Sequence, residues 1–354
     1  VNPDVGLIQT LPLPALQRSL FGRLLQFAGA LYGPVLASGQ AFWYGDAANY
    51  WGHNAIIRLR PFRDHAKLPV LSGRPPMGGE ILSHDFVEAA FLRRAGWRVV
   101  FVPSAAGSWE EVPANLDDYA RRDRRWAQGS LQHLRLLNMS GLHPLSRLHF
   151  LLGAMAYISS LLWMAILVSG TAYVLMPLSH GATLATRSLV EIPELSLLAV
   201  TASLLLLPKS FGLIVGLTRD RDAFGGPARL VISVLVETVF SVLLAPVMML
   251  SHARSIFDIS RGRAVGWSAQ DRERADLTWR EGLEVAFWPT VVGLIWGSAT
   301  LALSPLFFAW MSPIFLGLIC SVPLVRWTSL RSLGARARVA GLLLVPSEVF
   351  PRVR

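Results

Sequence analysis

Residues 150–178 read FLLGAMAYISSLLWMAILVSGTAYVLMPL and include no charged side chain. About 20 consecutive apolar residues suffice for a helix to cross a bilayer, so this stretch predicts a membrane-spanning helix. Further apolar stretches follow at residues 195–218, 230–251 and 285–325. The last is about twice as long as one crossing requires, and Ser304-Pro305 near its middle indicates the turn of a helical hairpin. The second half of the chain therefore predicts a transmembrane helix bundle.

The composition indicates a membrane protein that also has a polar part. The chain has 354 residues, of which 53% are hydrophobic and 16% are charged, whereas an ordinary soluble domain has about 25% charged residues. It contains one cysteine, and 33 Lys and Arg residues outnumber 23 Asp and Glu residues, which gives a net charge of +10. These values exclude a disordered chain, a disulfide scaffold and a simple soluble domain.

The mixed polarity of residues 1–147 is typical of a folded soluble region. Ser83-His84-Asp85 has the composition of a helix start, and we expect a helix over residues 85–95 that ends at Gly96. Residues 97–102 read WRVVFV, a nearly continuous apolar run that predicts a buried strand. The expected fold class is therefore α/β in the first part of the chain and membrane α-helical in the second.

A further helix is expected over residues 20–36, with Gly33-Pro34 near its end. This segment contains Arg23 and is short, so we do not expect it to cross a membrane.

The positions of the arginines predict which segments face the cytoplasm, because cytoplasmic loops are enriched in Lys and Arg. Arg residues are concentrated just before residue 148, within residues 252–284 and after residue 325. If residues 230–251 crossed the bilayer, the last two of these basic segments would lie outside. An interfacial helix there leaves every basic segment inside with four crossings, and a full crossing would also bury Glu237 at a cost. We favour the interfacial helix, with a crossing helix as the alternative.

Three regions are expected from these patterns. Residues 1–147 form a cytoplasmic region, residues 148–326 form the transmembrane bundle, and residues 327–354 form a basic cytoplasmic tail. Within the bundle, we expect the interfacial helix near residues 230–251 and a cytoplasmic loop over residues 252–284.

Asp85 is the first candidate for chemistry. A carboxylate at a helix start, beside His84 and preceded by Gly78-Gly79, has the features of a general base. An ordinary aspartate that initiates a helix is the alternative explanation, because capping and the helix dipole also favour Asp there.

The second candidate is the basic cluster at residues 121–126, which reads RRDRRW. Arginine makes bidentate hydrogen bonds to phosphate, and an indole ring can stack on a sugar. A juxtamembrane patch that attracts anionic lipid is the alternative explanation.

Other polar motifs carry weaker signals. The loop at residues 49–54, NYWGHN, could bind a hydroxylated ligand, although such a sequence more often forms a turn between strands. Asp220-Arg221-Asp222 has a metal-binding D-x-D pattern but lies between apolar runs, so we expect a solvated loop. The eight histidines show no metal-ligand spacing, and no phosphate-binding glycine motif is present.

The order of these features resembles the processive family 2 glycosyltransferases, such as cellulose synthase. That family has a T-E-D motif, then a Q-x-x-R-W motif, then membrane helices. Here Ser83-His84-Asp85 takes the first place and Arg122-Asp123-Arg124-Arg125-Trp126 the second. Both departures, together with GLIQT at residues 6–10 and YWGHNAIIR at residues 50–58, resemble the branch of the family that makes osmoregulated periplasmic glucans. The resemblance covers the whole chain and is most specific over residues 6–160.

The resemblance implies an inverting enzyme of the bacterial inner membrane that transfers glucose from UDP-glucose to a growing β-1,2-linked glucan. It implies that Asp85 deprotonates the acceptor hydroxyl. The leaving diphosphate would be bound by Arg122, Arg124 and Arg125. The acceptor sugar would be contacted by Gly52, His53, Asn54, His84 and Trp126. A weaker match to a gating loop falls on Val265, Trp267, Ser268 and Gln270.

The family's uridine-binding strands and metal-binding D-x-D motif have no counterpart in these 354 residues, so we expect a C-terminal part of a longer enzyme that is inactive alone. The resemblance implies Mg²⁺ or Mn²⁺ for the full-length enzyme, with no metal ligands in this chain. The expected partners are the glucan acceptor, the lipid bilayer, acyl carrier protein and periplasmic glucan-processing proteins, and nucleic acid is not among them. Another family 2 synthase, such as a cellulose-like one, is one alternative, and a transporter or channel without chemistry is the other.

Overall fold

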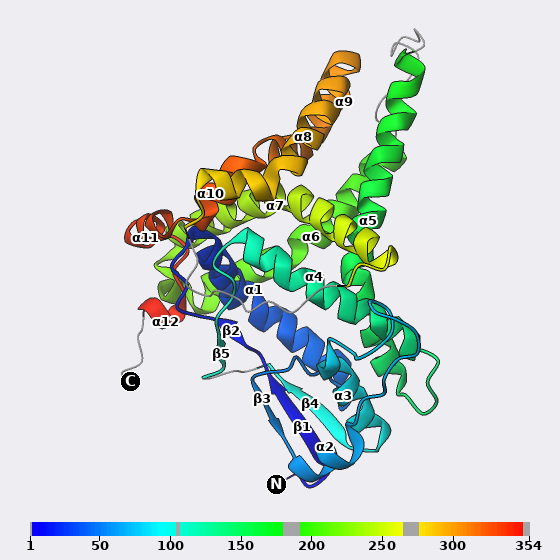
Figure 1. Ribbon diagram of the computed structural model, residues 1–354. Coiled ribbons are helices and arrows are strands. Elements are labelled where there is room, and N and C mark those ends of the chain that lie inside the picture. Colours follow the sequence, from blue (N-terminus) through cyan, green and yellow to red (C-terminus); the bar gives the residue numbers. More distant parts are fainter. Residues whose placement is uncertain (1, 104–106, 180–191, 265–275, 350–354) are drawn as a thin grey trace.

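The computed structural model has a small α/β unit at one end and long apolar helices that rise from the other (Figure 1). It describes residues 2–103, 107–179, 192–264 and 276–349. The α/β unit is built around a three-stranded sheet in the order β3-β1-β4, made of β3 (Ala55–Ile57), β1 (Val5–Thr10) and β4 (Arg98–Val102).

Strand β1 lies in the middle of this sheet. It runs antiparallel to β3 and parallel to β4, so that Leu7 pairs with both Ile57 and Val99. The side chains of Leu7 and Val99 are fully buried, as expected for a sheet covered on both faces. The strand predicted from WRVVFV is confirmed.

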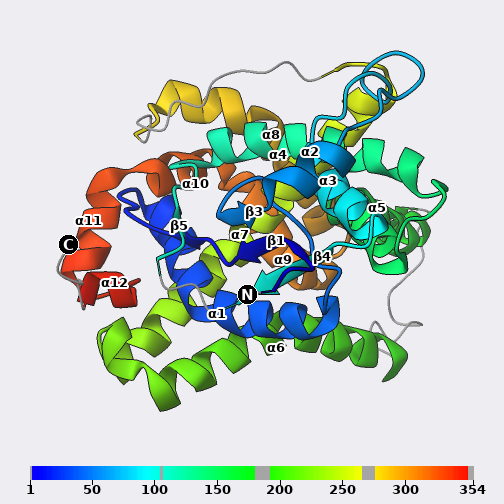
Figure 2. The ribbon, with the colours of Figure 1, turned by 90° about the horizontal axis from the view of Figure 1, so that it is seen from below.

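Helices cover both faces of the sheet (Figure 2). Helix α1 (Leu20–Tyr44) lies on one side, and α2 (Leu59–His65) and α3 (His84–Arg94) lie on the other. Helix α3 spans nearly the predicted residues, and Gly96 follows its end with a φ of 88°. Glycine adopts this left-handed backbone conformation at little cost, which explains why the chain turns from helix to strand there.

The predicted end of the first helix is wrong. Helix α1 continues through Pro34 to Tyr44 and has 25 residues, so it is long and apolar enough to count among the candidate membrane spans. Leu31, Tyr32 and Ala37 are buried on either side of the proline. Packing of this face outweighs the backbone hydrogen bond that a proline removes.

The remaining elements of the first part of the chain complete the frame of the site. Strands β2 (Leu13–Pro14) and β5 (Trp109–Glu110) form a parallel pair. Helix α4 (Leu116–His133) follows and leads through the short helix η1 (Leu134–Leu136) to the apolar helices. Asn115 caps α4, because its side chain accepts a hydrogen bond from the Asp118 backbone N–H at 2.9 Å.

Within the described residues, five helices are long and apolar enough to cross a membrane: α1, α5 (Pro144–Ser179), α6 (Ile192–Arg219), α7 (Pro227–Ser260) and α8 (Trp279–Leu303). Helices α9 (Pro305–Ile319) and α10 (Ser321–Ser329), bent by 55° at their junction, could form a sixth span. Ser304 caps α9 and separates it from α8, so the predicted hairpin turn is confirmed.

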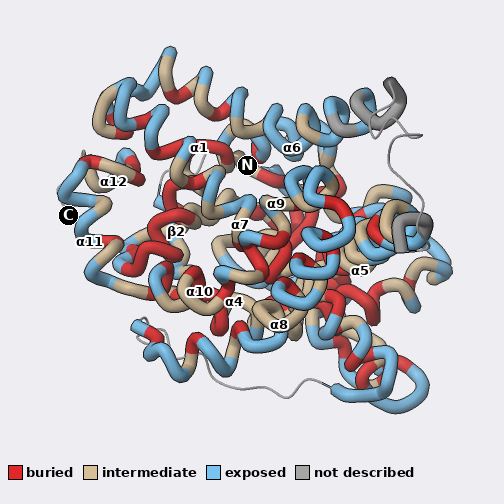
Figure 3. The backbone as a smooth tube through the Cα atoms, turned by 90° about the horizontal axis from the view of Figure 1, so that it is seen from above, coloured by how far each residue is buried: buried red, intermediate tan, exposed pale blue. Residues whose placement is uncertain are grey.

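The surface of the long helices is compatible with lipid. Figure 3 shows buried residues where α1, α4 and α7 meet and extensive exposed surface along α5 and α6. The run Leu204, Leu205, Leu206 and Leu207 on α6 is exposed. Such an apolar face is typical of a membrane or interaction surface.

Helix α7 differs from its prediction at one end. It continues to Ser260, and α8 begins at Trp279, so residues 252–260 and 279–284 are helical and do not belong to the loop that we expected over 252–284. Its Glu237 is buried and receives hydrogen bonds from Tyr32, Lys209 and Ser241. Burying a carboxylate that is paired with a cation costs less free energy than burying an unpaired one. This weakens the argument that Glu237 prevents helix α7 from crossing the bilayer. The interfacial placement stays a prediction.

The C-terminal residues fold back onto the start of α1. Short helices α11 (Arg331–Val339) and α12 (Pro346–Val349) follow α10, and η3 (Arg221–Phe224) joins α6 to α7. The guanidinium group of Arg23, which is buried, donates hydrogen bonds to Glu348 at 2.8 Å and to the Leu343 carbonyl at 2.9 Å. The tail is therefore attached to α1 through Leu343 and Glu348.

Candidate functional site

Asp85 lies in the first turn of α3 and faces the loop that precedes β3. A Cβ atom built on Gly52 would lie 3.3 Å from Oδ2 of Asp85, so the glycine backbone passes close to the carboxylate. Gly52 also has a φ of 82°, which a larger residue would adopt only with strain. The structure therefore brings together two of the predicted site residues, Asp85 and Gly52.

The surroundings of Asp85 make it a stronger base than a solvated aspartate. Burial raises the pKa of Asp85, while the Phe86 backbone N–H and the nearby His84 act in the opposite direction. Tyr50 lies close by, and its pKa is raised by burial and by the charges of Glu88 and Asp85. A carboxyl group with a raised pKa is suited to accept a proton from a hydroxyl group.

His84 is oriented by its own helix rather than by Asp85. Its Nδ1 lies 3.0 Å from Oε1 of Glu88, one turn further along α3. The hydrogen bond to Glu88 raises the pKa of His84. More than half of the His84 side chain is exposed, at the surface next to Asp85.

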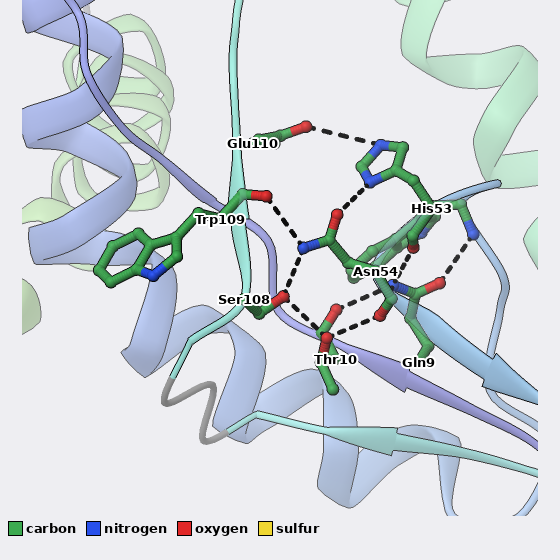
Figure 4. A network of polar contacts seen from close by, with 8 residues as sticks. Gln9, Thr10, His53, Asn54, Ser108, Trp109 and Glu110 are labelled. Atoms are coloured by element: carbon green, nitrogen blue, oxygen red, sulfur yellow. Dashed lines mark hydrogen bonds and ion pairs between the residues drawn. The ribbon is translucent and has the colours of Figure 1, made fainter. Parts of the chain in front are cut away.

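The acceptor loop that we predicted at Gly52, His53 and Asn54 is held by a polar network (Figure 4). The buried side chain of Gln9, at the end of β1, donates to the His53 carbonyl at 3.0 Å and accepts from the Trp51 N–H at 3.0 Å. Asn54 donates to Ser108 at 2.7 Å, and Thr10 donates to the Asn54 carbonyl at 2.6 Å. This network fixes the loop against β1 and the start of β5.

Glu110 connects this loop to the basic cluster. Its Oε2 lies 3.5 Å from Nε2 of His53. Burial raises the pKa of Glu110, and the charges of His53 and Arg122 lower it. Glu110 was not among our predicted site residues, and only the pairing of β5 with β2 brings it to this position.

Arg122 and Trp126 form a stacked pair on α4. The Arg122 guanidinium carbon lies 4.4 Å from the Trp126 ring centroid and 5.2 Å from that of Tyr119. The Trp126 side chain is 45% exposed. A guanidinium group stacked on an indole keeps its N–H groups in a plane that suits phosphate, and the exposed indole leaves room for a sugar.

The other arginines of the cluster point elsewhere or lie beside this pair. Arg124 donates a hydrogen bond from Nη2 to Oδ2 of Asp258 on α7, at 3.0 Å. Asp258 also receives a bond from Arg263, at 3.2 Å. Arg125 is half-buried on α4, next to Trp126. The structure thus shows Arg124 engaged with α7, whereas the half-buried Arg122 lies over the Trp126 ring.

Helix α4 also packs directly on the segment that carries Asp85. A Cβ atom on Gly129 would lie 2.6 Å from the Ser83 Cβ and 2.7 Å from the Ser83 backbone nitrogen, so only glycine fits. Gln132 accepts a hydrogen bond from the Leu82 N–H at 3.0 Å and donates to the Glu80 carbonyl at 3.1 Å. The helix that carries Arg122 and Trp126 therefore also fixes the approach to Asp85.

One face of α4 carries Arg122, Trp126 and Gly129, whereas Gln132 lies beside that face. Arg122, Trp126, Gly129 and His133 are spaced at i, i+4, i+7 and i+11, which places them in one stripe of an α-helix. Trp126 and Gly129 are about 4.5 Å apart along the helix axis, at 1.5 Å per residue. We did not select Gly129, Gln132 or His133 from the sequence, although this spacing is visible in it.

Three predicted features are placed away from this site or outside the described chain. Asp220, Arg221 and Asp222 are exposed at η3, which confirms that this D-x-D pattern lies on a solvated segment. The gating-loop residues Val265, Trp267, Ser268 and Gln270 lie outside the described residues. No group of three or more His, Cys, Asp or Glu side chains is arranged to bind a metal ion within the described ranges.

Comparison with known proteins supports the resemblance found in the sequence. Residues 2–176 match the model of "Glycosyl transferase family group 2". The chain is 43% identical to "Glucans biosynthesis glucosyltransferase H" of Xanthomonas euvesicatoria pv. vesicatoria, over 99% of this chain and 56% of that protein. The protein of the same name from Xylella fastidiosa is 41% identical over the same shares of the two chains. That of Rhodopseudomonas palustris is 43% identical over 99% of this chain and 50% of its own length.

The chain thus spans about half the length of these relatives, and the family match covers its α/β unit together with most of α5. The contacts of Gly52 with Asp85 and of Gly129 with Ser83 both fall within the matched residues. Residues 2–176 are therefore similar to glycosyl transferase family group 2, in a chain that is similar over nearly its whole length to glucans biosynthesis glucosyltransferase H proteins.

Proposed function

We propose that this chain is the acceptor-side and membrane part of an inverting glucosyltransferase, which transfers glucose from UDP-glucose to a growing β-1,2-linked glucan. The observation that carries the proposal is the packing of α4 on the Ser83-His84-Asp85 segment. This contact holds a candidate base and a stacked Arg122–Trp126 pair in one unit, within the residues that match the family.

Asp85 is the general base in this proposal. The acceptor hydroxyl oxygen attacks the anomeric carbon of glucose and gives its proton to the Asp85 carboxylate. The bond from that carbon to the diphosphate oxygen breaks, and its electron pair leaves with UDP. Because attack and departure occur on opposite faces, the configuration at the anomeric carbon is inverted.

The arginines of α4 stabilise the leaving group. Negative charge accumulates on the diphosphate as the bond breaks, and fixed cations favour that transition state. Arg122 and Arg125 are assigned this role. Arg124 would share it through those guanidinium nitrogens that do not bond to Asp258.

The acceptor glucan lies against the exposed Trp126 ring, since an indole is apolar on its faces and can bind the C–H face of a sugar. Gly52, His53, Asn54 and His84 bound the acceptor side. The polar network behind the loop keeps Gly52 close to Asp85, so an acceptor hydroxyl there would lie near the base.

The remaining partners follow from the family rather than from this chain. A divalent cation, Mg²⁺ or Mn²⁺, would neutralise the donor diphosphate, and we assign its ligands to residues outside this chain. The proposed location is the bacterial inner membrane, with the α/β unit on the cytoplasmic side. Acyl carrier protein and periplasmic glucan-processing proteins are proposed partners.

The Asp85→Asn variant of the complete gene product tests the assignment. General-base removal typically lowers a rate about 10²- to 10⁴-fold, and we expect loss of glucan synthesis with UDP-glucose binding retained. Asp64→Asn, which changes an exposed carboxylate on α2, is the matched control and should remain active. Glucan synthesis by Asp85→Asn at the wild-type rate would remove Asp85 from the base role.

Two measurements separate the proposal from its rivals. Linkage analysis of the product distinguishes a β-1,2-glucan synthase from a cellulose-like synthase. Glucan-dependent release of UDP distinguishes either enzyme from a transporter, which would release none.

A further inference from the structure

His133 lies at the end of the α4 stripe that begins with Arg122, and its side chain is 0% exposed. Its Nε2 lies 2.7 Å from the carbonyl oxygen of Ser83. A carbonyl oxygen only accepts hydrogen bonds, so Nε2 carries the proton and donates it. The side chain therefore binds the backbone two residues before Asp85.

The same ring also contacts the residue that follows Asp85. It stacks on Phe86, with ring centroids 5.7 Å apart and planes inclined by 25°, and it packs on Phe150 of α5 at 5.1 Å. His133 thus touches the chain on both sides of the candidate base, through a hydrogen bond to Ser83 and a ring contact with Phe86.

The protonation state of His133 is constant in the working range of such an enzyme. Burial lowers the pKa of His133 to about 4, against the hydrogen bond to Ser83, which raises it. The imidazole is therefore neutral near pH 7. Its Nδ1 is buried and has no hydrogen-bond partner among the described residues. A purely apolar ring would avoid the cost of that unpaired nitrogen, so the Nε2 hydrogen bond is the feature that packing alone does not explain.

We infer that His133 is a positioning residue for Asp85, which it holds at the site by donating a hydrogen bond to the Ser83 carbonyl while packing on Phe86. This inference rests on the proposed function, because it gives Asp85 the role of the base. His133 does not reach the reacting atoms itself. It transmits the position of α4, and with it that of Arg122 and Trp126, to the start of α3.

Two variants of the complete gene product separate the hydrogen bond from the packing. His133→Phe keeps an aromatic ring but removes the donor, and His133→Gln keeps an N–H donor. A displacement of about 1 Å in a catalytic group can cost about 100-fold, so we expect His133→Phe to lower kcat by about 10- to 100-fold. The KM for UDP-glucose should change less than about 2-fold, since Asp85 acts on the acceptor. His133→Gln should recover a large part of kcat.

His149→Phe is the matched control. His149 is also buried and lies 3.1 Å from a backbone carbonyl oxygen, but that carbonyl belongs to Ala47, and its ring packs on Tyr44 at 4.6 Å. We expect its kcat to stay within about 3-fold of the wild type, because ordinary structural substitutions away from a site leave the chemical step intact.

A double variant and a pH profile exclude a merely structural effect. Residues that act as one unit are not additive, so His133→Phe should cause no further loss in an Asp85→Asn background. A base that is less well held becomes more hydrated, so the pKa of Asp85 should fall. The acid limb of the kcat/KM profile of His133→Phe should therefore move to lower pH.

The outcomes distinguish the inference from the proposed function. Near-wild-type kcat in His133→Phe, or equal losses in His133→Phe and His133→Gln, would overturn the inference while leaving Asp85 as the base. An active Asp85→Asn enzyme would overturn the proposed function itself. If His133→Phe does not fold, His133→Gln and the Asp85→Asn/His133→Gln double variant decide the question by the same non-additivity.

Discussion

Gly129 of α4 is pressed against the backbone of Ser83, with room for no side chain: a Cβ atom there would stand 2.6 Å from the Ser83 Cβ. This contact joins the helix that carries Arg122 and Trp126 to the segment that leads into Asp85. The site is therefore a property of how α4 packs on residues 76–83, where Gln128 also donates a hydrogen bond to the Pro76 carbonyl at 3.2 Å.

Gly129→Ala should weaken both the fold and the activity. Overpacking a tight contact usually costs about 1–3 kcal/mol, and α4 can relieve the clash only by moving away from Ser83. We expect a lower melting temperature in detergent and reduced glucan synthesis. Gly39→Ala on α1 is the control and should be neutral or slightly stabilising, because an added Cβ atom there would meet no described atom beyond its own helical turn within 4 Å. Equal melting temperatures for the two variants would contradict the packing argument.

Gly52→Ala should lower activity more than stability. A residue with a side chain pays about 1–2 kcal/mol for the left-handed backbone, and its Cβ would also crowd Oδ2 of Asp85 at 3.3 Å. Gly96→Ala imposes similar strain, at a φ of 88°, but its Cβ atom would meet no described atom other than those of its chain neighbours within 4 Å. We expect similar melting temperatures for the two variants and lost glucan synthesis only in Gly52→Ala. Activity lost equally in both would assign the effect to backbone strain alone.

His84→Gln should move the pH dependence of the reaction. The charge of His84 lowers the pKa of Asp85, and burial raises it. Removing His84 therefore raises the pKa of Asp85 further. Because a base must be deprotonated to act, the acid limb of the kcat/KM profile should move to higher pH in this variant. Titration of activity from acid to neutral pH measures the shift, and a limb that stays in place would contradict it.

Ser160→Ala should destabilise the junction of three helices. His252 of α7 lies 2.9 Å from the buried Asp123 of α4 and 3.0 Å from the Ser160 hydroxyl of α5. Loss of one such hydrogen bond lowers the free energy of unfolding by about 1 kcal/mol. We expect this loss to appear as a lower melting temperature. The control is Ser159→Ala, because the Ser159 hydroxyl is exposed and bonds only within its own helix. A melting temperature as high as that of this control would show that the hydroxyl contributes nothing.

Lys209→Met should be more harmful than the simultaneous removal of its partner. The single change leaves Glu237 buried without its cation, which typically costs about 3–5 kcal/mol. Lys209→Met combined with Glu237→Leu removes both charges and should recover much of the stability. Thermal unfolding in detergent measures both variants. A double variant less stable than Lys209→Met would mean that the ion pair itself, and not its desolvation, dominates.

Local patterns in the sequence were sufficient to predict many of the helices and strands. A strand over residues 98–102, a helix that starts at Ser83-His84-Asp85, and a helical break at Ser304-Pro305 are all present as expected. These features depend on backbone preferences and apolar periodicity, which neighbouring residues determine. The first helix was predicted to end at residue 36, shortly after Pro34, because the packing of Ala37, Ala41 and Tyr44 against the sheet is not visible in the sequence.

Some residues of the candidate site were predicted from the sequence, and others were recognised only in the structure. Asp85, the Arg122–Trp126 pair and the Gly52 loop were found because their residue types and order carry chemical meaning within the sequence itself. Glu110, Gln132 and His133 were not, because their roles depend on which strands pair and on which face of α4 meets Ser83. Apolar lengths alone predicted the long apolar helices α5, α6, α7 and α8, whereas the partner of the buried Glu237, and the pairing of Arg124 with Asp258, required contacts between residues far apart in the chain. Long-range contacts of this kind are fixed by tertiary packing and leave no local pattern in the sequence.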